Sequence, residues 1–400
     1  MDTNRTAKKN PNNRRKCDRI SSRQWADANG IVTAHELDNA QLAELLARQA
    51  ENARPPLTRA FRRASRRAFL WPEEASSLQK LGRSLTELQG IGPYLQKLIR
   101  TWFSDAPLPP SPPALRSGFL TFTQAQTILA TKPEWMASLK GDLQMHSLWS
   151  DGSTSIAEMA AAAAELDYEY IAITDHAKGL KIAGGIDEVQ LCEQANEIAS
   201  LNRSLEDAGQ KLRVLRSIEL NLNPEGQGDM EPQALAELDI VIGCFHSALR
   251  RKEDQTERYL AALRNPTIQI LGHPRGRIYN YRAGLSADWA RVFTLAAELD
   301  KAVEIDAYPD RQDLSPDLLT LARDAGCRIS FGTDAHGPSQ LRFMAFAAAS
   351  ALRSGIARER ILNFMSRDRL LDWVRHVREV KHPDERTGLK WRRRKADPDR

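Results

Sequence analysis

Five short segments of the sequence place a histidine or an acid where it could bind a metal ion. They contain five of the eight histidines of the chain. The segments read DLQMH at 142–146, TDH at 174–176, CFH at 244–246, GHP at 272–274 and GTDAH at 332–336. Imidazole and carboxylate groups together suit zinc, manganese or iron. A single such histidine is typical of a satisfied core residue, but five in similar settings indicate a multi-metal hydrolytic centre.

Each of these segments closes a short apolar run that is typical of a β-strand. The predicted strands are 142–146, 170–174, 214–220, 240–245, 268–272, 303–306 and 328–332. The predicted helices are 156–165, 186–206, 256–264, 289–299 and 316–325. This alternation predicts an α/β fold with a parallel sheet, and polar residues at each strand end favour a closed barrel over 141–380. Parallel barrels carry their sites at the C-terminal strand ends, so the metal-binding residues should share one rim.

The part of the chain before the barrel has a helical pattern over 35–104. One helix should run through residues 42–50 with Asn39 as its N-cap. A second should start after Pro55-Pro56 and end at Pro72, with apolar residues on one face and arginines on the other. Residues 105–140 read as a proline-rich linker and a short helical connector around 123–137.

The stretch Gly90-Ile91-Gly92-Pro93 should lie between two short helical stretches. Glycines permit a tight turn, and a proline suits the first position of the second helix. This pattern resembles a helix-hairpin-helix, a DNA backbone clamp whose helix start would seat a phosphate. Gly90, Gly92 and Lys97 are then DNA-binding candidates. An ordinary turn between packed helices is the alternative.

Composition narrows the class of protein. The chain is 42% hydrophobic and has no apolar run near 20 residues, so we expect no membrane span. The first residues are polar and basic, unlike a secretory signal. The four cysteines are widely spaced, which favours reduced thiols and a cytoplasmic location. Basic segments at 1–34 and 381–400 are expected to be solvated, disordered ends or to attract phosphate backbones.

Longer motifs carry a family resemblance. They read GDLQMH at 141–146, KGLKIAGG at 178–185, GHPRGR at 272–277, EIDAYPDR at 304–311 and GTDAH at 332–336. With them, residues 141 to about 345 resemble a PHP domain, a metal-dependent phosphoesterase, and most closely the PHP domain attached to bacterial family X DNA polymerases. The resemblance implies a distorted (β/α)7 barrel with two to three divalent ions, manganese or zinc, with iron as a third option.

The resemblance also implies the metal ligands. The implied sets are His146, Glu219 and Asp334 for one ion, Glu219, His246 and His273 for a second, and Asp151, His176 and His336 for a third. Glu219 would therefore bridge two ions. Asp175 is expected to orient ligand histidines. The family's usual His-x-His motif has Gln144 at its first position here, and a neutral amide is a poorer ligand, so one metal is expected to bind more weakly.

Basic residues just past the strand ends could hold a phosphate. Arg275 is the main candidate, with a role near the reacting group, and Arg277 and Arg311 are further substrate-binding candidates. Lys178 and Lys181 are expected to line the same mouth. A salt bridge at the barrel rim is the alternative for each of these residues.

The resemblance to a polymerase has a gap. Only about 35 residues separate the helical part from the barrel, and they contain no Gly-Ser nucleotide loop and no Asp-x-Asp pair. We therefore expect no polymerase activity. Aligned through the hairpin, Leu98 takes the place of the lysine that removes deoxyribose phosphate in animal repair polymerases. Lys97 would point elsewhere, because a helix turns by about 100° per residue.

The leading hypothesis is a DNA-end phosphoesterase of DNA repair, a 3′-5′ exonuclease or 3′-phosphatase that could also process abasic sites. A small-molecule phosphatase of the histidinol-phosphate or nucleotide type is the first rival. A non-enzymatic DNA-binding protein with a degenerate barrel is the second. The expected partners are DNA and a phosphate ester, with no membrane, and the sequence identifies no protein partner.

Overall fold

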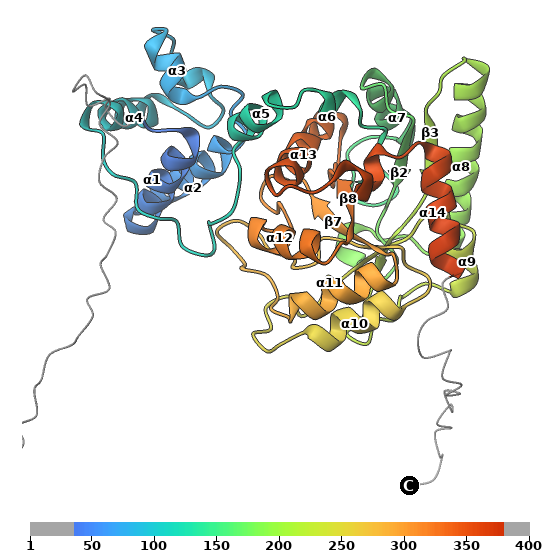
Figure 1. The fold of residues 1–400 in the computed structure, drawn as a ribbon. Helices are drawn as coiled ribbons and strands as arrows, with labels where there is room; N and C mark the ends of the chain where they lie inside the picture. The colour runs from blue at the N-terminus through green and yellow to red at the C-terminus, as the bar shows by residue number, and fades with distance from the viewer. Residues whose placement is uncertain (1–35, 380–400) are drawn as a thin grey trace, which may run out of the picture. The chain divides into compact units, whose positions relative to one another are not determined.

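Parallel strands and the helices between them build the C-terminal part of the molecule (Figure 1). The computed structural model describes residues 36–379, so the basic segments predicted at 1–34 and 381–400 lie outside the described residues. The strands are β1 Gly141–Met145, β2 Tyr170–Ile173, β3 Arg213–Arg216, β4 Glu219–Asn221, β5 Ile242–Cys244, β6 Ile270–Leu271, β7 Ala302–Asp306 and β8 Arg328–Gly332. They form a parallel sheet β1-β2-β3 and a parallel sheet β4-β5-β6-β7-β8.

Backbone hydrogen bonds join the two sheets at both edges. Next to β8, the amide of Asp334 donates to the carbonyl of Gln144 at 3.1 Å, and His146 donates to Ala335 at 2.8 Å. At the other edge, the amide of Ala177 donates to Glu219 at 3.1 Å, in a parallel bridge between His176 and Glu219. The strands therefore close into the predicted barrel.

One predicted strand is divided in two. The run 214–220 was expected to be continuous, but β3 pairs with β2 while β4 pairs with β5, and Ser217 and Ile218 lie between them. β3 and β4 together therefore fill one position in a seven-membered, distorted barrel. The break brings Glu219 beside the end of β2.

Helices surround the strands (Figure 1). They are α7 Ile156–Glu165, α8 Glu188–Asp207, α9 Pro232–Ala236, α10 Thr256–Arg264, α11 Trp289–Glu298, α12 Pro316–Asp324, α13 Met344–Arg353 and α14 Arg367–Glu379. The five predicted helices correspond to α7, α8, α10, α11 and α12. At the N-terminal ends of the strands, α14 packs apolar residues such as Leu370 and Trp373 against buried residues that include Tyr170 and Ala302. This packing closes that end of the barrel and leaves the opposite rim for a site.

Helices also form the segment before the barrel. They are α1 Asn39–Asn52, α2 Leu57–Ala68, α3 Ala75–Lys80 and α4 Pro93–Asp105. The N-cap of α1 is Asp38 and not the expected Asn39, because the Asp38 side chain accepts from the amide of Gln41 in a capping box. The first half of the expected hairpin is only a 3-10 turn, Leu85–Glu87, and α2 ends at Ala68, before Pro72. Between this segment and the barrel lie two short helices, α5 Phe122–Ala130 and α6 Glu134–Ala137.

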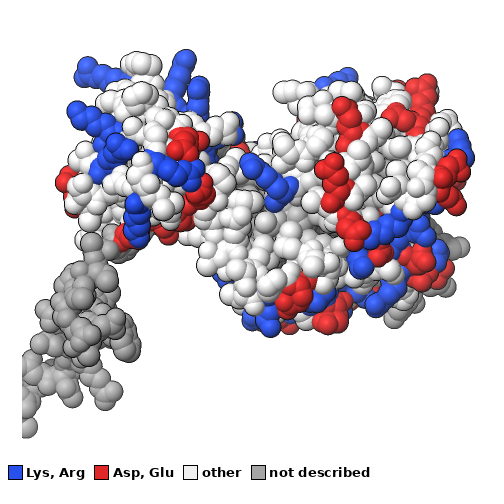
Figure 2. Space-filling view, turned by 90° about the horizontal axis from the view of Figure 1, so that it is seen from above, with Lys and Arg blue, Asp and Glu red and all other residues white. Residues whose placement is uncertain are grey.

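The α2 helix is strongly two-sided. Phe61, Ala64 and Ala68 are buried in the core of the helical segment, as predicted. The opposite side, which we call the arginine face, consists of Arg59, Arg62, Arg63, Arg66 and Arg67. Figure 2 shows Lys and Arg side chains gathered on the helical segment.

A barrel loop reaches into the core of the helical segment. Tyr279 is 2% exposed, and its ring lies 4.7 Å from that of Phe69 and 5.3 Å from that of Phe119. Its hydroxyl lies 3.1 Å from the Ser65 hydroxyl on α2. The helical segment and the barrel belong to one compact unit that begins at Leu37. None of the helices described in residues 36–379 has the length and apolar character that crossing a membrane requires.

A buried lysine gives the barrel a testable pH dependence. Lys301 is 1% exposed, its ammonium donates to the Asn265 carbonyl at 2.6 Å, and burial lowers its pKa to about 7. Between this value and the ordinary pKa near 10.5, the unfolded chain binds more protons than the folded chain, so stability rises with pH. Between pH 7 and 9.5 the contribution should reach up to about 3 kcal/mol. Urea unfolding at several pH values should show this increment in the native protein.

The variant Lys301→Met should lose that increment, because the group that titrates is absent. Lys132→Met is the matched control, since Lys132 is exposed on the surface. Identical pH profiles for the native protein and Lys301→Met would contradict a depressed pKa at this position.

Candidate metal centre

Glu219 lies at the centre of a cluster of imidazole rings. Its Oε1 is 2.8 Å from Nε2 of His246 and 2.8 Å from Nε2 of His273. Its Oε2 is 3.3 Å from Nε2 of His146 and 3.4 Å from Nδ1 of His176. Each carboxylate oxygen therefore faces two histidines, which is the arrangement that a bridging ligand requires.

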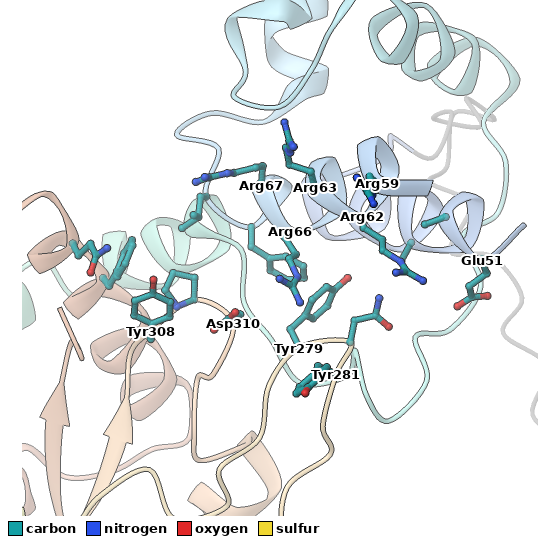
Figure 3. Close-up of a pocket in the computed structure, with 18 residues that line it drawn as sticks. Glu51, Arg59, Arg62, Arg63, Arg66, Arg67, Tyr279, Tyr281, Tyr308 and Asp310 are labelled. Carbon is teal, nitrogen blue, oxygen red and sulfur yellow. The ribbon is translucent and has the colours of Figure 1, made fainter. Parts of the chain in front are cut away.

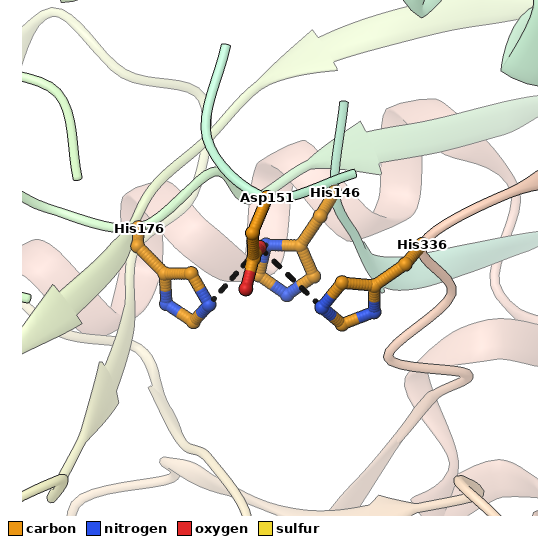
Figure 4. A group of neighbouring side chains, drawn as sticks. All are labelled: His146, Asp151, His176 and His336. Atoms are coloured by element: carbon orange, nitrogen blue, oxygen red, sulfur yellow. Dashed lines mark ion pairs between the residues drawn. The ribbon is translucent and has the colours of Figure 1, made fainter. Parts of the chain in front are cut away.

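A second acid gathers three histidines at the open side of the cluster (Figure 4). Oδ1 of Asp151 lies 3.5 Å from Nε2 of His176 and 3.4 Å from Nε2 of His336. The rings of His146 and His176 stack at 4.4 Å, and Nδ1 of His146 is 4.0 Å from Asp151. Asp151 and His336 are partly exposed while His146 is buried, so this side faces the solvent.

The chemistry of these donors fits divalent metal ions. Within residues 36–379, four groups have ligand atoms within 4.8 Å of one another, namely His146-Asp151-His176-His336, His176-Glu219-His246, Glu219-Cys244-His273 and His146-Glu219-Asp334. Among the described residues, the buried Nδ1 atoms of His146 and His176 have no hydrogen-bond partner. A bound cation would satisfy such atoms, because buried polar groups normally have partners.

The structure brings the residues of the predicted ligand sets close together. His146, Glu219 and Asp334 form one group, and Asp151, His176 and His336 form another that His146 joins. The set Glu219, His246 and His273 is brought together through Oε1 of Glu219. All eight predicted ligands therefore lie in one continuous cluster.

The protonation of the acids also suits cations. Burial alone would raise the pKa of Glu219, but His176, His246 and His273 hold it well below its ordinary value. The same is true of Asp334, whose pKa is lowered by Arg311 and His146 against the effect of burial. Both side chains are therefore carboxylates at neutral pH, as metal ligands must be.

The ends of the strands position these groups. Asp334 follows β8 and has φ of 51°, a left-handed conformation that aspartate adopts more readily than most residues. Gly332 precedes it, and a Cβ there would lie 2.3 Å from Oε1 of Glu304 and 2.6 Å from Cβ of Gln144. The absence of a side chain at 332 therefore allows β8 to approach β1 at the centre.

Gln144 contacts the bridging carboxylate. Its Nε2 donates to Oε2 of Glu219 at 3.1 Å, and its buried Oε1 has no partner. The amide thus lies where the usual histidine was expected to bind a metal. It holds Glu219 through a hydrogen bond, and a single amide oxygen remains as a potential ligand.

Asp175 has other partners than the ligand histidines that it was expected to orient. Its carboxylate accepts from the amide and hydroxyl of Ser147 at 2.8 and 2.6 Å, from the Ser150 hydroxyl at 2.5 Å and from Gln194 at 2.7 Å. These contacts fix the loop that follows β1 and carries Asp151. Asp175 is therefore a positioning residue for this loop.

The three arginine candidates have different surroundings. Arg311 lies at the centre, where its Nε is 3.2 Å from Oδ2 of Asp334 and 3.6 Å from Oδ2 of Asp306. Arg275 donates to Ser315 at 3.2 Å and to the Ala283 carbonyl at 2.8 Å, so its guanidinium already contacts neighbouring loop residues. Arg311 is thus the better placed of the two for a phosphate.

Arg277 does not have the surroundings of a substrate-binding residue. It is buried, its Nε donates to the Arg311 carbonyl at 2.9 Å, and its Nη2 donates to the Gly118 carbonyl at 2.8 Å. Its guanidinium also lies 3.9 Å from the centre of the Phe119 ring. These contacts anchor the connector before α5, which corrects the role expected from the sequence.

The remaining candidates lie on exposed loops and helices. Lys178 pairs with Glu188 at 2.7 Å, and Lys181 is exposed in the loop after β2. Gly90, Gly92 and Lys97 are also exposed, with Gly90 at φ of 90° and Gly92 as the N-cap of α4. The start of α4 is therefore open to a ligand.

Two buried groups at the centre were missed by sequence reasoning. Cys244 forms a potential ligand group with Glu219 and His273, although burial raises the pKa of its thiol well above the ordinary value. Glu304 accepts from the amide of His273 at 2.6 Å, and burial raises its pKa to about 8. Cys244 ends one apolar strand and Glu304 lies inside another, so only the direction of each side chain distinguishes it from the core.

Comparisons with known proteins identify the barrel. Residues 142–309 match the model of the PHP domain. The DNA polymerase/3′-5′ exonuclease PolX of Bacillus subtilis is 36% identical over 269 residues, which is 67% of this chain and 46% of that protein. The chain thus spans less than half the length of this relative. A probable phosphatase of Caldanaerobacter subterraneus is 28% identical over 207 residues, 49% of this chain and 75% of that protein.

The fold was also compared with solved structures. One match is the histidinol phosphate phosphatase of Lactococcus lactis in complex with zinc, L-histidinol and phosphate. The match covers 55% of this chain and 94% of the phosphatase chain, with 19% identity and a TM-score of 0.42. The motifs at the strand ends, the clustered ligands and the match over residues 142–309 agree with one another. Residues 142–309 of this chain therefore form a PHP domain.

Proposed function

We propose that this protein hydrolyses phosphate esters at DNA ends, as a 3′-5′ exonuclease or a 3′-phosphatase that can also process abasic sites. The proposed hydrolysis rests on the position of Glu219, whose two carboxylate oxygens each face two histidines at the barrel rim. The similarity to PolX supports DNA as the substrate, because it extends over 269 residues, more than the PHP match covers.

Two to three divalent ions, manganese or zinc, would be held by the eight predicted ligands. When bound, such ions make water a nucleophile near neutral pH and neutralise charge on phosphate oxygens. The protein supplies the geometry: Glu219 links the inner histidines, and Asp151 links the outer ones. Asp175 keeps the loop with Asp151 in place through Ser147 and Ser150.

Arg311 is the residue that we assign to the phosphate. Burial opposes its charge, but the carboxylates of Asp334 and Asp306 raise its pKa, so it stays a cation beside the centre. A guanidinium presents donors in a planar fork that matches two phosphate oxygens. Arg275, Lys178 and Lys181 are further along the rim loops and would contact more distant parts of the substrate.

The helical segment would hold the DNA backbone. The start of α4 at Gly92 is exposed and has no side-chain cap among the described residues, and Gly90 provides the turn before it. Lys97 lies on the same helix and is exposed as well. These features support a backbone contact that does not depend on base sequence.

An activity panel in Mn²⁺ tests this proposal. Substrates with a 3′-hydroxyl, a 3′-phosphate and an abasic site are compared with a small phosphomonoester. At least one DNA substrate should be converted, and His273→Ala should reduce the rate by about 100-fold or more, since weakening the surroundings of a ligand alone costs up to that factor.

The matched control is His376→Ala, because His376 is an exposed histidine on α14. Its activity should equal that of the native protein. A protein that binds Mn²⁺ and converts none of the DNA substrates would disprove the proposed function.

The small-molecule phosphatase is the second candidate. The similarity to probable phosphatases at 28% identity favours this second candidate, since the match covers 75% of the length of one of these proteins. It predicts fast turnover of the small phosphomonoester with no gain from DNA. In that case changes to the arginine face of α2 would leave every activity unchanged.

A further inference from the structure

A cleft of about 930 Å³ lies between the arginine face of α2 and barrel loops that follow β6 and β7 (Figure 3). Tyr279, Tyr281 and Tyr308 line the barrel side, and Glu51 and Asp310 are the acids in its wall. Figure 3 shows the Arg66 side chain extending toward Tyr279. The cleft is thus bounded by guanidinium groups on one side and by aromatic rings on the other.

The charge of the cleft is suited to an anion. Five arginines against two acids give its lining a net positive charge. Within residues 36–379, none of the five guanidinium groups forms an ion pair with a carboxylate. A solvated helix face that binds no ligand has the same kind of charge, so the net charge alone does not identify a binding site.

The position of the cleft is the second observation. Tyr308 lines it, and the Tyr308 ring lies 6.2 Å from the ring of His336. Gln340 also lines it and accepts from the His336 amide at 2.7 Å. One end of the cleft therefore borders the outer histidine of the metal centre, next to Asp151. An anion bound along α2 would reach the ions without leaving the protein surface.

The shape of the lining points to a polymer with phosphates on one side and flat rings on the other. Arg59 and Arg66 are separated by two turns of α2, about 10 Å at 1.5 Å per residue, which suits at least two successive phosphates. Tyr281 is 55% exposed, and the Arg250 guanidinium lies 4.8 Å from its ring centre, so a base would stack on the ring face opposite Arg250. Bases are free to stack on side chains only where the strand is unpaired.

We propose that this cleft holds the last nucleotides of a single nucleic-acid strand and presents its 3′ end to the metal centre. The proposal rests on the proposed function and adds the form of the substrate and the residues that position it. Arg62, Arg66 and Tyr281 are positioning residues, since they lie along the strand and away from the reacting phosphate. The hairpin at Gly92 would contact a more distant part of the DNA.

Binding of a labelled oligothymidylate tests the proposal separately from catalysis. The strand carries phosphorothioate linkages at its 3′ end to prevent hydrolysis, and fluorescence anisotropy is measured in Mn²⁺ at several salt concentrations. The double variant Arg62→Gln and Arg66→Gln should bind at least tenfold more weakly. The slope of log K against log salt should fall by about 1.4, because each lost contact to a single strand contributes about 0.7.

The matched control removes two exposed arginines elsewhere, Arg203→Gln on α8 and Arg264→Gln on α10. It should bind the strand as the native protein does. Tyr281→Ala should weaken binding by about fivefold or more, as expected for one lost stacking contact, with the unfolding temperature unchanged.

Three results would overturn the proposal. One is equal binding by the arginine double variant and its control. Another is an equal loss of affinity for a blunt-ended duplex in the arginine double variant, which would mean that the cleft recognises phosphates without requiring an unpaired strand. The third is binding of the oligothymidylate by Tyr281→Ala that equals binding by the native protein. If the strand binds in the cleft but none of the DNA substrates in the activity panel is converted in Mn²⁺, the proposed function is refuted and the binding site remains.

Discussion

Replacing Glu219 by glutamine should abolish metal-dependent hydrolysis while leaving the barrel folded. The substitution keeps the size of the side chain and its hydrogen bond with Gln144 within reach, but it removes the negative charge. Oε1 of Glu219 faces His246 and His273, and Oε2 faces His146 and His176. One change therefore affects every ion that this carboxylate would share.

We expect the activity of Glu219→Gln to fall by about 10³-fold or more, because groups that act as a unit lose most of their effect together. Metal analysis by mass spectrometry should show at least one ion fewer per chain than in the native protein. The gain in unfolding temperature on adding Mn²⁺ should shrink as well, since ligand binding stabilises the folded state by mass action.

Glu193→Gln is the matched control, because Glu193 is an exposed acid on α8. It should keep full activity and the native metal content. If Glu219→Gln kept both, Glu219 would not be a bridging ligand and the centre would have to be assigned differently.

The sequence predicted the rim of the barrel well because strand ends have a strong local signal. An apolar run that stops at a histidine or an acid can be read without tertiary contacts, and this applies to His146, His176, His246 and His273. The helices between the strands follow from apolar periodicity in the same way. The eight ligand candidates were named from these strand ends together with the resemblance to the PHP domain.

The division of β3 from β4 could not be read in this way. Apolar residues continue through Ile218, and nothing local marks the change of partner from β2 to β5. Arg277 was misjudged for a similar reason. It lies four residues after His273, but its direction is set by carbonyls near Gly118, about 160 positions away. Contacts of this range depend on how the helical segment packs on the barrel.

Truncating Arg116 should cause the largest loss of stability outside the metal centre. Arg116 lies in the connector, and its side chain is 4% exposed. Its Nε and Nη2 form a two-pronged pair with Glu44 of α1 at 2.8 and 2.9 Å. Its Nη1 donates to Glu51 at 2.8 Å and to Asn280 of the barrel at 3.0 Å. It thus connects α1, the connector and the barrel.

Arg116→Ala would leave the Glu44 carboxylate buried without its counter-ion. Removing one partner of a buried pair costs about 3–5 kcal/mol, because the remaining charge is neither solvated nor neutralised. Urea unfolding followed by circular dichroism should show a loss of this size. Arg48→Ala is the control: Arg48 is exposed and lies 3.6 Å from Glu51, so its loss should change stability by less than about 1 kcal/mol.

A second variant separates the charge from the packing. Replacing both partners, Arg116→Met with Glu44→Leu, should recover most of the stability, since two apolar groups of similar size leave no buried charge. The same double variant lacks the contact with Asn280, which lines the cleft beside Tyr279 and Tyr281. If the cleft guides a strand to the metal centre, this stable variant should still bind the oligothymidylate more weakly than the native protein.

An Arg116→Ala protein that is as stable as the native protein would contradict the stability prediction. It would show that Glu44 contacts solvent or another partner, and that other contacts hold α1 on the barrel.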